Sequence, residues 1–110
     1  RGGFEQQNGC LVFHFTGQLD AYSEKQFMEY VVDVLKASQL PAVIDLSKID
    51  FLDSSGLGAL VQLAKQCTDA KRAFSLVGNS RVMQTVKLVR LEEFLHLAQD
   101  LPSALSNLAA

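Results

Sequence analysis

Apolar and polar residues alternate in the first part of the chain as they do in half-buried β-strands. Residues 10–16 are rich in aromatic and β-branched side chains, with Asn8-Gly9 before them and Gly17 after them. This pattern predicts a strand over residues 10–16. We expect residues 4–7 to pair with it, because Asn8-Gly9 favours a tight hairpin turn in which both residues take a positive φ.

The next two segments combine a helical repeat with a short apolar run. The apolar side chains that recur at helical spacing are Phe27, Val31, Val34 and Leu35. They predict an amphipathic helix over residues 22–38. Pro41 ends this segment, since the residue before a proline avoids the helical region, and the apolar residues 42–46 predict a strand buried on both faces.

The second half of the chain repeats this order of elements. Residues 53–55 are natural caps for a second helix, whose apolar face comprises Leu57, Leu60, Val61, Ala64 and Thr68. A third buried strand is predicted over residues 73–77. The third helix has an apolar face formed by Val82, Val86 and Val89. Residues 94–98 predict a last strand, and Asp100 with Pro102 begins a short terminal helix.

Strands that alternate with helices of this length imply crossover connections and a mostly parallel sheet. With the hairpin at the start, we predict an α/β fold with a mixed, mostly parallel sheet of four to five strands and about four helices. The 110 residues, of which 48% are hydrophobic, suffice for one core. One domain over residues 1–110 is therefore expected.

Charge and cysteine content narrow the classes of partner. The net charge of −2 and the isolated basic pair Lys71-Arg72 provide no positive surface for nucleic acid.

Cys10 and Cys67 form no CxxC pair, which argues against zinc or a disulfide framework and predicts two small buried side chains. No apolar run approaches the ~20 residues that cross a bilayer, and residues 1–3 lack a signal-peptide pattern. We expect a cytoplasmic protein without membrane contact, and leave open whether further segments flank the chain.

One segment contains residues suited to a chemical modification. This serine segment is Asp53-Ser54-Ser55-Gly56-Leu57-Gly58. It lies at a predicted helix start, where free backbone N–H groups and the helix dipole favour negative charge, so a phosphoryl group would be tolerated. Gly56 and Gly58 would let another protein approach closely. The alternative is that Asp53 and the serines only cap the helix, which leaves unexplained two glycines that each cost about 1 kcal/mol of helix propensity.

The serine segment, following an apolar strand, resembles the phosphorylation motif of the anti-sigma factor antagonists in the STAS family. Residues 17–20 are similar to the family's Gly-Glu-Leu-Asp segment, with Gln18 in place of the glutamate, and the order of elements matches along essentially the whole chain. The resemblance implies a single STAS domain. It also implies that Ser54 accepts the phosphate, with Ser55 as second choice. The residues that would contact the partner are Asp20, Asp53, Ser55, Gly56, Leu57 and Gly58.

The resemblance implies partners as well. In this bacterial family, an anti-sigma factor that is itself a serine kinase phosphorylates the antagonist, and a PP2C-like phosphatase removes the phosphate. The unphosphorylated antagonist binds the kinase, frees the sigma factor and so regulates transcription, whereas the phosphorylated form does not bind. ATP would then belong to the partner. We therefore expect this chain to need no cofactor and not to be an enzyme.

Elementary electrostatics predicts the same direction of switching. A phosphate adds about −1.5 to −2 charges, which an exposed helix start accommodates without loss of the fold. In an interface near Asp20, Asp50 and Asp53 the phosphate would meet like charge and lose hydration. A penalty of ~3 kcal/mol would weaken binding roughly 150-fold. Asp20 itself is expected to orient the Ser54 hydroxyl, to contact the partner or to cap the first helix.

Other functions have less support in the sequence. A hydrolase would need a Gly-x-Ser-x-Gly elbow and a base, yet His14 and His96 lie far from the serines and alternate with apolar residues as strand residues do. Gly56 and Gly58 lack the third glycine or Lys-Ser/Thr pair of a phosphate-binding loop, which leaves weak nucleotide binding open. The main alternative is a STAS scaffold or transporter-associated domain that binds partners without phosphorylation, and fold alone does not exclude it.

Overall fold

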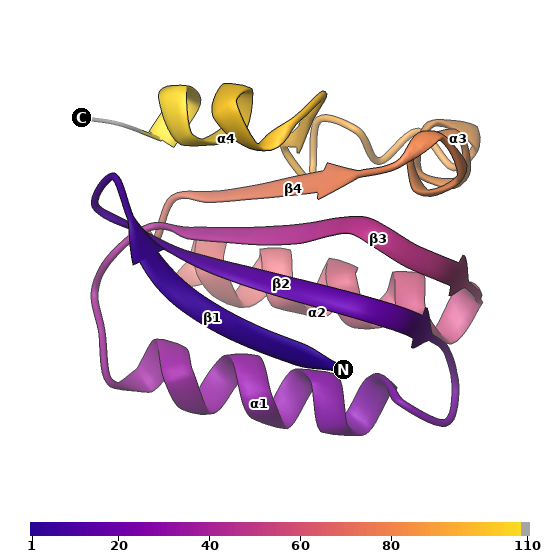
Figure 1. The fold of residues 1–110 in the computed structure, drawn as a ribbon, viewed down its shortest axis with the longest axis horizontal. Coiled ribbons are helices and arrows are strands. Elements are labelled where there is room, and N and C mark those ends of the chain that lie inside the picture. The colour runs from indigo at the N-terminus through magenta and orange to yellow at the C-terminus, as the bar shows by residue number, and fades with distance from the viewer. Residues whose placement is uncertain (109–110) are drawn as a thin grey trace.

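The computed structural model describes residues 1–108, which form the strands and helices shown in Figure 1. The strands are β1 (Gly2–Gln7), β2 (Cys10–Leu19), β3 (Ala42–Leu52), β4 (Phe74–Gly78) and β5 (Leu97–Ala98). The helices are α1 (Glu24–Lys36), α2 (Ser54–Asp69), α3 (Ser80–Leu88) and α4 (Leu101–Leu108). Within the described residues, the predicted α/β architecture is confirmed.

The strands join in one sheet in the order β1-β2-β3-β4-β5. β1 runs antiparallel to β2, and the other neighbouring pairs are parallel. The predicted turn connects β1 and β2, with φ of 53° at Asn8 and 76° at Gly9. Two successive positive φ values match the twist of the flanking strands. The prediction of a mixed, mostly parallel sheet is therefore confirmed.

Helices cover both faces of the sheet, so the core has two parts. α1 and α2 lie on one side of the strands and α4 lies on the other (Figure 1). The larger part of the core, on the side of α1 and α2, contains Phe13 of β2 and Leu60 of α2. The smaller part, on the side of α4, contains Val12 of β2 and Leu105 of α4. Successive side chains of β2 thus enter opposite parts of the core, as the two-residue period of a strand requires.

β2 and β3 are longer than the sequence pattern predicts. The strand predicted over residues 10–16 continues to Leu19, and the one predicted over residues 42–46 continues to Leu52. The pairing register shifts between His14 and Thr16 and again after Gly17, whose φ is 88°. These irregularities interrupt the alternation of apolar residues, which is why the pattern ends early. They also carry both strands on to the serine segment.

Three further predictions need correction. α1 begins at Glu24 instead of residue 22, because Asp20 and its hydrogen bonds hold residues 20–23 in a turn. Val89 is 48% exposed at the end of α3 and is not part of its buried face. The strand predicted over residues 94–98 shortens to Leu97–Ala98, because the residues before it form turns closed by Leu95 N–H to Leu91 O (2.9 Å).

The prediction that Cys10 and Cys67 are small buried side chains is confirmed. Cys10 and Cys67 are free and at most 2% exposed. Burial raises the pKa of both thiols, an effect that Arg72 opposes at Cys67, so both are held as thiols.

His14 Nδ1 lies 3.0 Å from Asp45 Oδ2, and its Nε2 lies 3.2 Å from Glu5 Oε2. His14 therefore joins β1, β2 and β3 on the face of the sheet.

Two kinds of feature are absent from residues 1–108. Across this range no helix combines the length and apolar character needed to cross a membrane. The same residues contain no group of three or more histidine, cysteine, aspartate or glutamate side chains placed to hold a metal ion.

Arg72 closes the carboxyl end of α1. Its guanidinium group donates to the carbonyl oxygens of Leu40 (2.7 Å), Leu35 (2.8 Å) and Ser38. Leu35 lies in the last turn of α1, and Ser38 and Leu40 lie in the segment that follows it. A partly buried carbonyl group that loses its donor costs about 1–3 kcal/mol. Arg72 lies three residues after the end of α2, so one side chain joins the two helices on this face of the sheet.

We predict that Arg72→Met lowers the free energy of unfolding by about 2 kcal/mol, because three carbonyl oxygens lose a charged donor while most of the side-chain volume is kept. Urea denaturation of the purified protein measures the loss. Lys65→Met is the matched control, since Lys65 is 71% exposed and makes a long surface ion pair with Asp69. That variant should stay within about 0.5 kcal/mol of the wild type. Equal effects of the two changes would contradict the structural role of Arg72.

Candidate functional site

The serine segment lies at the edge of the sheet where the parallel strands end. β2 ends at Leu19, β3 ends at Leu52, and the two residues are paired in register. α2 starts two residues after Leu52, and α3 starts two residues after the end of β4. In parallel sheets this carboxyl edge gathers the connecting loops and is where ligands and partners usually bind. The strand irregularities described above bring residues 19–23 and 53–58 together there.

Asp53 holds the serine segment to the neighbouring loop. Its Oδ1 accepts a hydrogen bond from Gly56 N–H (2.8 Å) and caps α2, as predicted for this residue. Its Oδ2 accepts from Ala21 N–H (3.1 Å), and its own N–H donates to Leu19 O (3.3 Å). The capping interpretation is therefore confirmed for Asp53. It does not extend to Ser54 and Ser55, which are the first residues of the helix itself.

Ser54 and Ser55 are both exposed at the start of α2. The carboxylate of Asp53 already occupies the position at the helix start that an anion would prefer. Because Ser54 is exposed, a phosphoryl group attached to it would lie at the surface. It would also stand one residue from the negative charge of Asp53, which adds to its repulsion of other anions.

The two glycines of the serine segment have different surroundings. Gly56 is buried, and a Cβ atom there would overlap the carbonyl group of Leu19. Gly58 is exposed, and a Cβ atom there would meet nothing within 4 Å. The sequence suggested that both glycines leave room for a partner. The structure gives Gly56 an internal reason, the close packing of α2 on β2, and leaves Gly58 as the glycine that a partner can approach.

Leu57 and Asp20 are placed mainly by internal contacts. Leu57 is partly buried and packs against the larger part of the core. Asp20 Oδ1 accepts from Tyr22 N–H (3.0 Å) and Ser23 N–H (3.1 Å). Ser23, and not Asp20, stands at the N-cap position of α1. Asp20 thus shapes the turn that presents Ala21 to Asp53, and this is its structural link to the serine segment.

Two exposed aromatic residues flank the serine segment and escaped the sequence analysis. Tyr22 is 96% exposed and follows Ala21, which is bonded to Asp53. Phe51 is 45% exposed near the end of β3. Large exposed aromatic side chains are enriched in the centres of protein interfaces. Tyr22 stands two residues after Asp20, and this position is the sequence signal that could have found it. Phe51 lies just after a shift in the β2–β3 register, so the alternation of a regular strand does not indicate its exposure.

Charge at this edge is mixed. Asp20, Asp50 and Asp53 supply the negative groups named by the sequence analysis. Arg81, in the first turn of α3, donates from its guanidinium group to the main-chain oxygen of Asp50 (2.9 Å). Asn79 caps α3 by accepting from Val82 N–H (2.9 Å). The edge therefore presents exposed hydroxyls and aromatic rings between carboxylates and one arginine, which suits binding of a protein surface.

Solved structures with the same fold include proteins of different kinds. An anti-sigma factor antagonist from Mycobacterium paratuberculosis aligns at a TM-score of 0.81 and 24% identity, over 100% of this chain and 94% of its own. The Bacillus cell fate determinant SpoIIAA in its phosphorylated form aligns at 0.67 and 15%, over 91% and 93%. The murine Solute Carrier 26 family member A9 anion transporter aligns at 0.78 and 16%, over 94% of this chain and 18% of its own.

Sequence identities this low establish only that these proteins share a fold, and proteins with one fold can have different functions. Membership of a family is established separately by the sequence. A family model described as the STAS domain matches residues 4–104, from within β1 to within α4. The chain therefore belongs to the STAS domain family.

Proposed function

We propose that this chain is an anti-sigma factor antagonist whose binding to an anti-sigma factor serine kinase is switched off by phosphorylation of Ser54. The observation that supports it most directly is the exposed Ser54 at the start of a helix whose cap is already filled by Asp53. The likeness to an antagonist and to a protein with a phosphorylated form agrees with this function. Ser55 is the second choice for the acceptor.

The geometry supports a switch that would act on binding and leave the fold intact. Ser54 is exposed, so its phosphate would break no internal contact. A partner that covers Ser54, Gly58 and the aromatic side chains of Tyr22 and Phe51 would have to desolvate that phosphate beside Asp53. Burying an uncompensated charge costs several kcal/mol, and even ~3 kcal/mol weakens binding roughly 150-fold. The repulsion therefore falls on the complex.

The chemistry of phosphate transfer is assigned to the partners. We propose that the chain is a substrate without catalytic activity or cofactor, that the kinase brings ATP and that a PP2C-like phosphatase reverses the modification. His14, the nearer histidine in sequence, is held by Asp45 and Glu5 on the face of the sheet and is not available as a base for Ser54. The cycle would operate in the bacterial cytoplasm, without nucleic-acid or membrane contact by this chain.

The first test locates the phosphate. We predict that incubation with ATP and the serine kinases of the source cell modifies Ser54, and that peptide mass spectrometry finds the phosphate on the peptide with residues 54 and 55. Ser54→Ala should abolish most of the signal. Ser80 provides an internal control, because it is also exposed at a helix start, behind the neutral cap Asn79. Phosphate on Ser80 with none on Ser54 or Ser55 would contradict the proposal.

The second test measures the switch. Ser54→Ala should bind the kinase as tightly as the unmodified protein even after incubation with ATP, because it cannot gain charge. Ser54→Asp should weaken binding by about tenfold or more, since one charge reproduces part of the effect of a phosphate. Calorimetry with the purified kinase gives both affinities, and Ser106→Asp, on the exposed surface of α4, is the matched control that should bind like the unmodified protein. Equal binding by phosphorylated and unmodified protein would favour the alternative, a phosphorylation-independent interaction domain such as a transporter-associated one.

The third test concerns the surface around the serine. We predict that Tyr22→Ala weakens kinase binding by about 1–2 kcal/mol without changing stability, because this side chain is 96% exposed and has no core contact to lose. Phe94→Ala is the control, since Phe94 is 41% exposed but precedes β5 and so lies away from the carboxyl edge. The same calorimetric titration compares the two variants. If Phe94→Ala weakened kinase binding and Tyr22→Ala did not, the interface would not lie at the carboxyl edge.

A further inference from the structure

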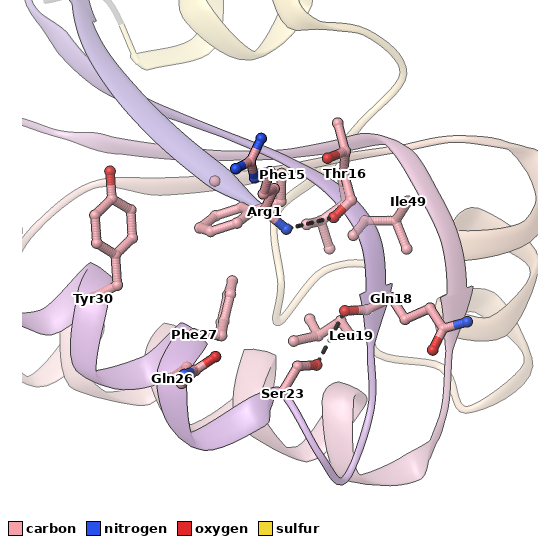
Figure 2. A pocket seen from close by; sticks show the side chains of 12 residues that line it. Arg1, Phe15, Thr16, Gln18, Leu19, Ser23, Gln26, Phe27, Tyr30 and Ile49 are labelled. Carbon is pink, nitrogen blue, oxygen red and sulfur yellow. Dashed lines mark hydrogen bonds between the residues drawn. The ribbon is translucent and has the colours of Figure 1, made fainter.

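Helix α1 and the second half of β2 enclose a cavity of about 210 Å³ that the proposed function does not use (Figure 2). It opens beside the amino end of β1, where Arg1 lies. Its apolar wall includes Leu19, Phe27, Leu46 and Ile49, each at most 6% exposed. These four residues come from α1, β2 and β3, so the wall is part of the rigid core.

The size and lining of the cavity fit a single aromatic ring. The ring of Phe15 lies 4.9 Å from that of Phe27, and 6.2 Å from that of Tyr30 in an edge-on arrangement. In Figure 2 the Phe27 side chain rises from α1 toward Phe15 on the sheet. An apolar cavity of about 150 Å³ can bind benzene, whereas drug-sized ligands need about 300 Å³ or more. A ring with one short substituent therefore fits.

The polar side chains at the rim indicate the charge of that substituent. Among the residues that line the cavity, Arg1 is the only charged one, and no carboxylate lines it. Gln26, exposed on α1, adds an amide donor. A guanidinium group binds a carboxylate through charge-assisted hydrogen bonds, and a ligand amine would find no opposite charge. The lining thus favours a small aromatic carboxylate.

The cavity wall is continuous with the serine segment. Leu19 lines the cavity, and its carbonyl oxygen accepts from Asp53 N–H and lies over Gly56. Ser23 also lines the cavity, and its Oγ accepts from Asp20 N–H (3.0 Å) and donates to Gln18 O (3.0 Å), a bond drawn in Figure 2. A ligand that immobilises residues 19–23 would therefore restrain Ala21, which donates to the Asp53 carboxylate, and the Leu19 carbonyl group, against which Gly56 packs.

We infer that this cavity is a binding site for a small aromatic carboxylate, and that its occupant stabilises the hydrogen bonds of Asp53 at the start of α2. The binding itself is independent of the proposed function. The stabilised hydrogen bonds of Asp53 would let a metabolite control the Ser54 switch, and only this consequence rests on the proposed function. A ligand shifts an equilibrium between two states only if it binds one of them more strongly. The ligand must therefore bind more strongly to the state in which the hydrogen bonds of Asp53 are formed.

Benzoate is the probe, and the full unmodified chain without any partner is the sample. Titration followed by two-dimensional amide NMR should give saturable shifts at residues that line the cavity, with a dissociation constant of about millimolar order for so small a ligand. Benzylamine, which has the same ring and the opposite charge, should bind more weakly. Shifts absent up to about 50 mM benzoate, or confined to residues elsewhere, overturn the site, as does tighter binding of benzylamine.

Two variants locate the charge. Arg1→Gln should weaken benzoate binding about fivefold and leave benzylamine no weaker, because only the carboxylate loses its partner. Lys25→Gln is the matched control on exposed α1 surface outside the cavity lining, and should leave both affinities unchanged. Equal weakening by both variants would mean a nonspecific charge effect and overturn the assignment. Both positions are exposed, so neither change endangers the fold.

Hydrogen exchange tests the second part. With saturating benzoate, exchange of the Gly56 and Ala21 amides, which both donate to Asp53, should slow severalfold. The Val82 amide is the control, since it donates to Asn79 in the equivalent cap of α3 and should be unaffected. Equal protection of all three amides, or of none, would overturn the coupling. None of these experiments contains a kinase. Their results therefore do not depend on whether the proposed phosphorylation switch exists.

Discussion

The contact between the first turn of α2 and the end of β2 fixes the arrangement of the whole carboxyl edge. Gly56 lies so close to the Leu19 carbonyl group that no side chain fits between them. Asp53 then bonds in three directions, to Gly56, to Ala21 and to Leu19. Because this packing sets the direction of α2, it also decides that Ser54 is exposed. The proposed phosphorylation site is thus held in place by close packing and by three hydrogen bonds of Asp53.

Rigidity and exposure together are what a charge-operated binding switch requires. A phosphate on a loose loop could turn away from an approaching partner, and the repulsion would be relieved. On the first residue of a capped helix it cannot, since the backbone is held by Asp53 and the helix behind it. Because Ser54 is exposed, a phosphate there would place its charge at the surface.

The sequence predicts the elements of this fold better than their lengths. The Asn8-Gly9 turn, the helical spacing in α1 and the Asp53 cap are local signals, and each is found where it was predicted. The extension of β2 past Gly17 is decided by pairing with β3, a contact between distant residues. The internal role of Gly56 and the exposure of Tyr22 likewise depend on where α2 and α1 pack. No local pattern contains that information.

The two helix caps at this edge show why a charged residue stands at one and a neutral residue at the other. Asn79 accepts from Val82 N–H and donates to Ile49 O (2.7 Å), so its amide group serves a donor and an acceptor. Asp53 faces two donors, Gly56 N–H and Ala21 N–H, which a carboxylate satisfies and an amide cannot. The loop of residues 19–23 therefore requires an anion beside the serines. That anion, present to hold the fold together, also adds to the charge that a phosphorylated Ser54 would present to a partner.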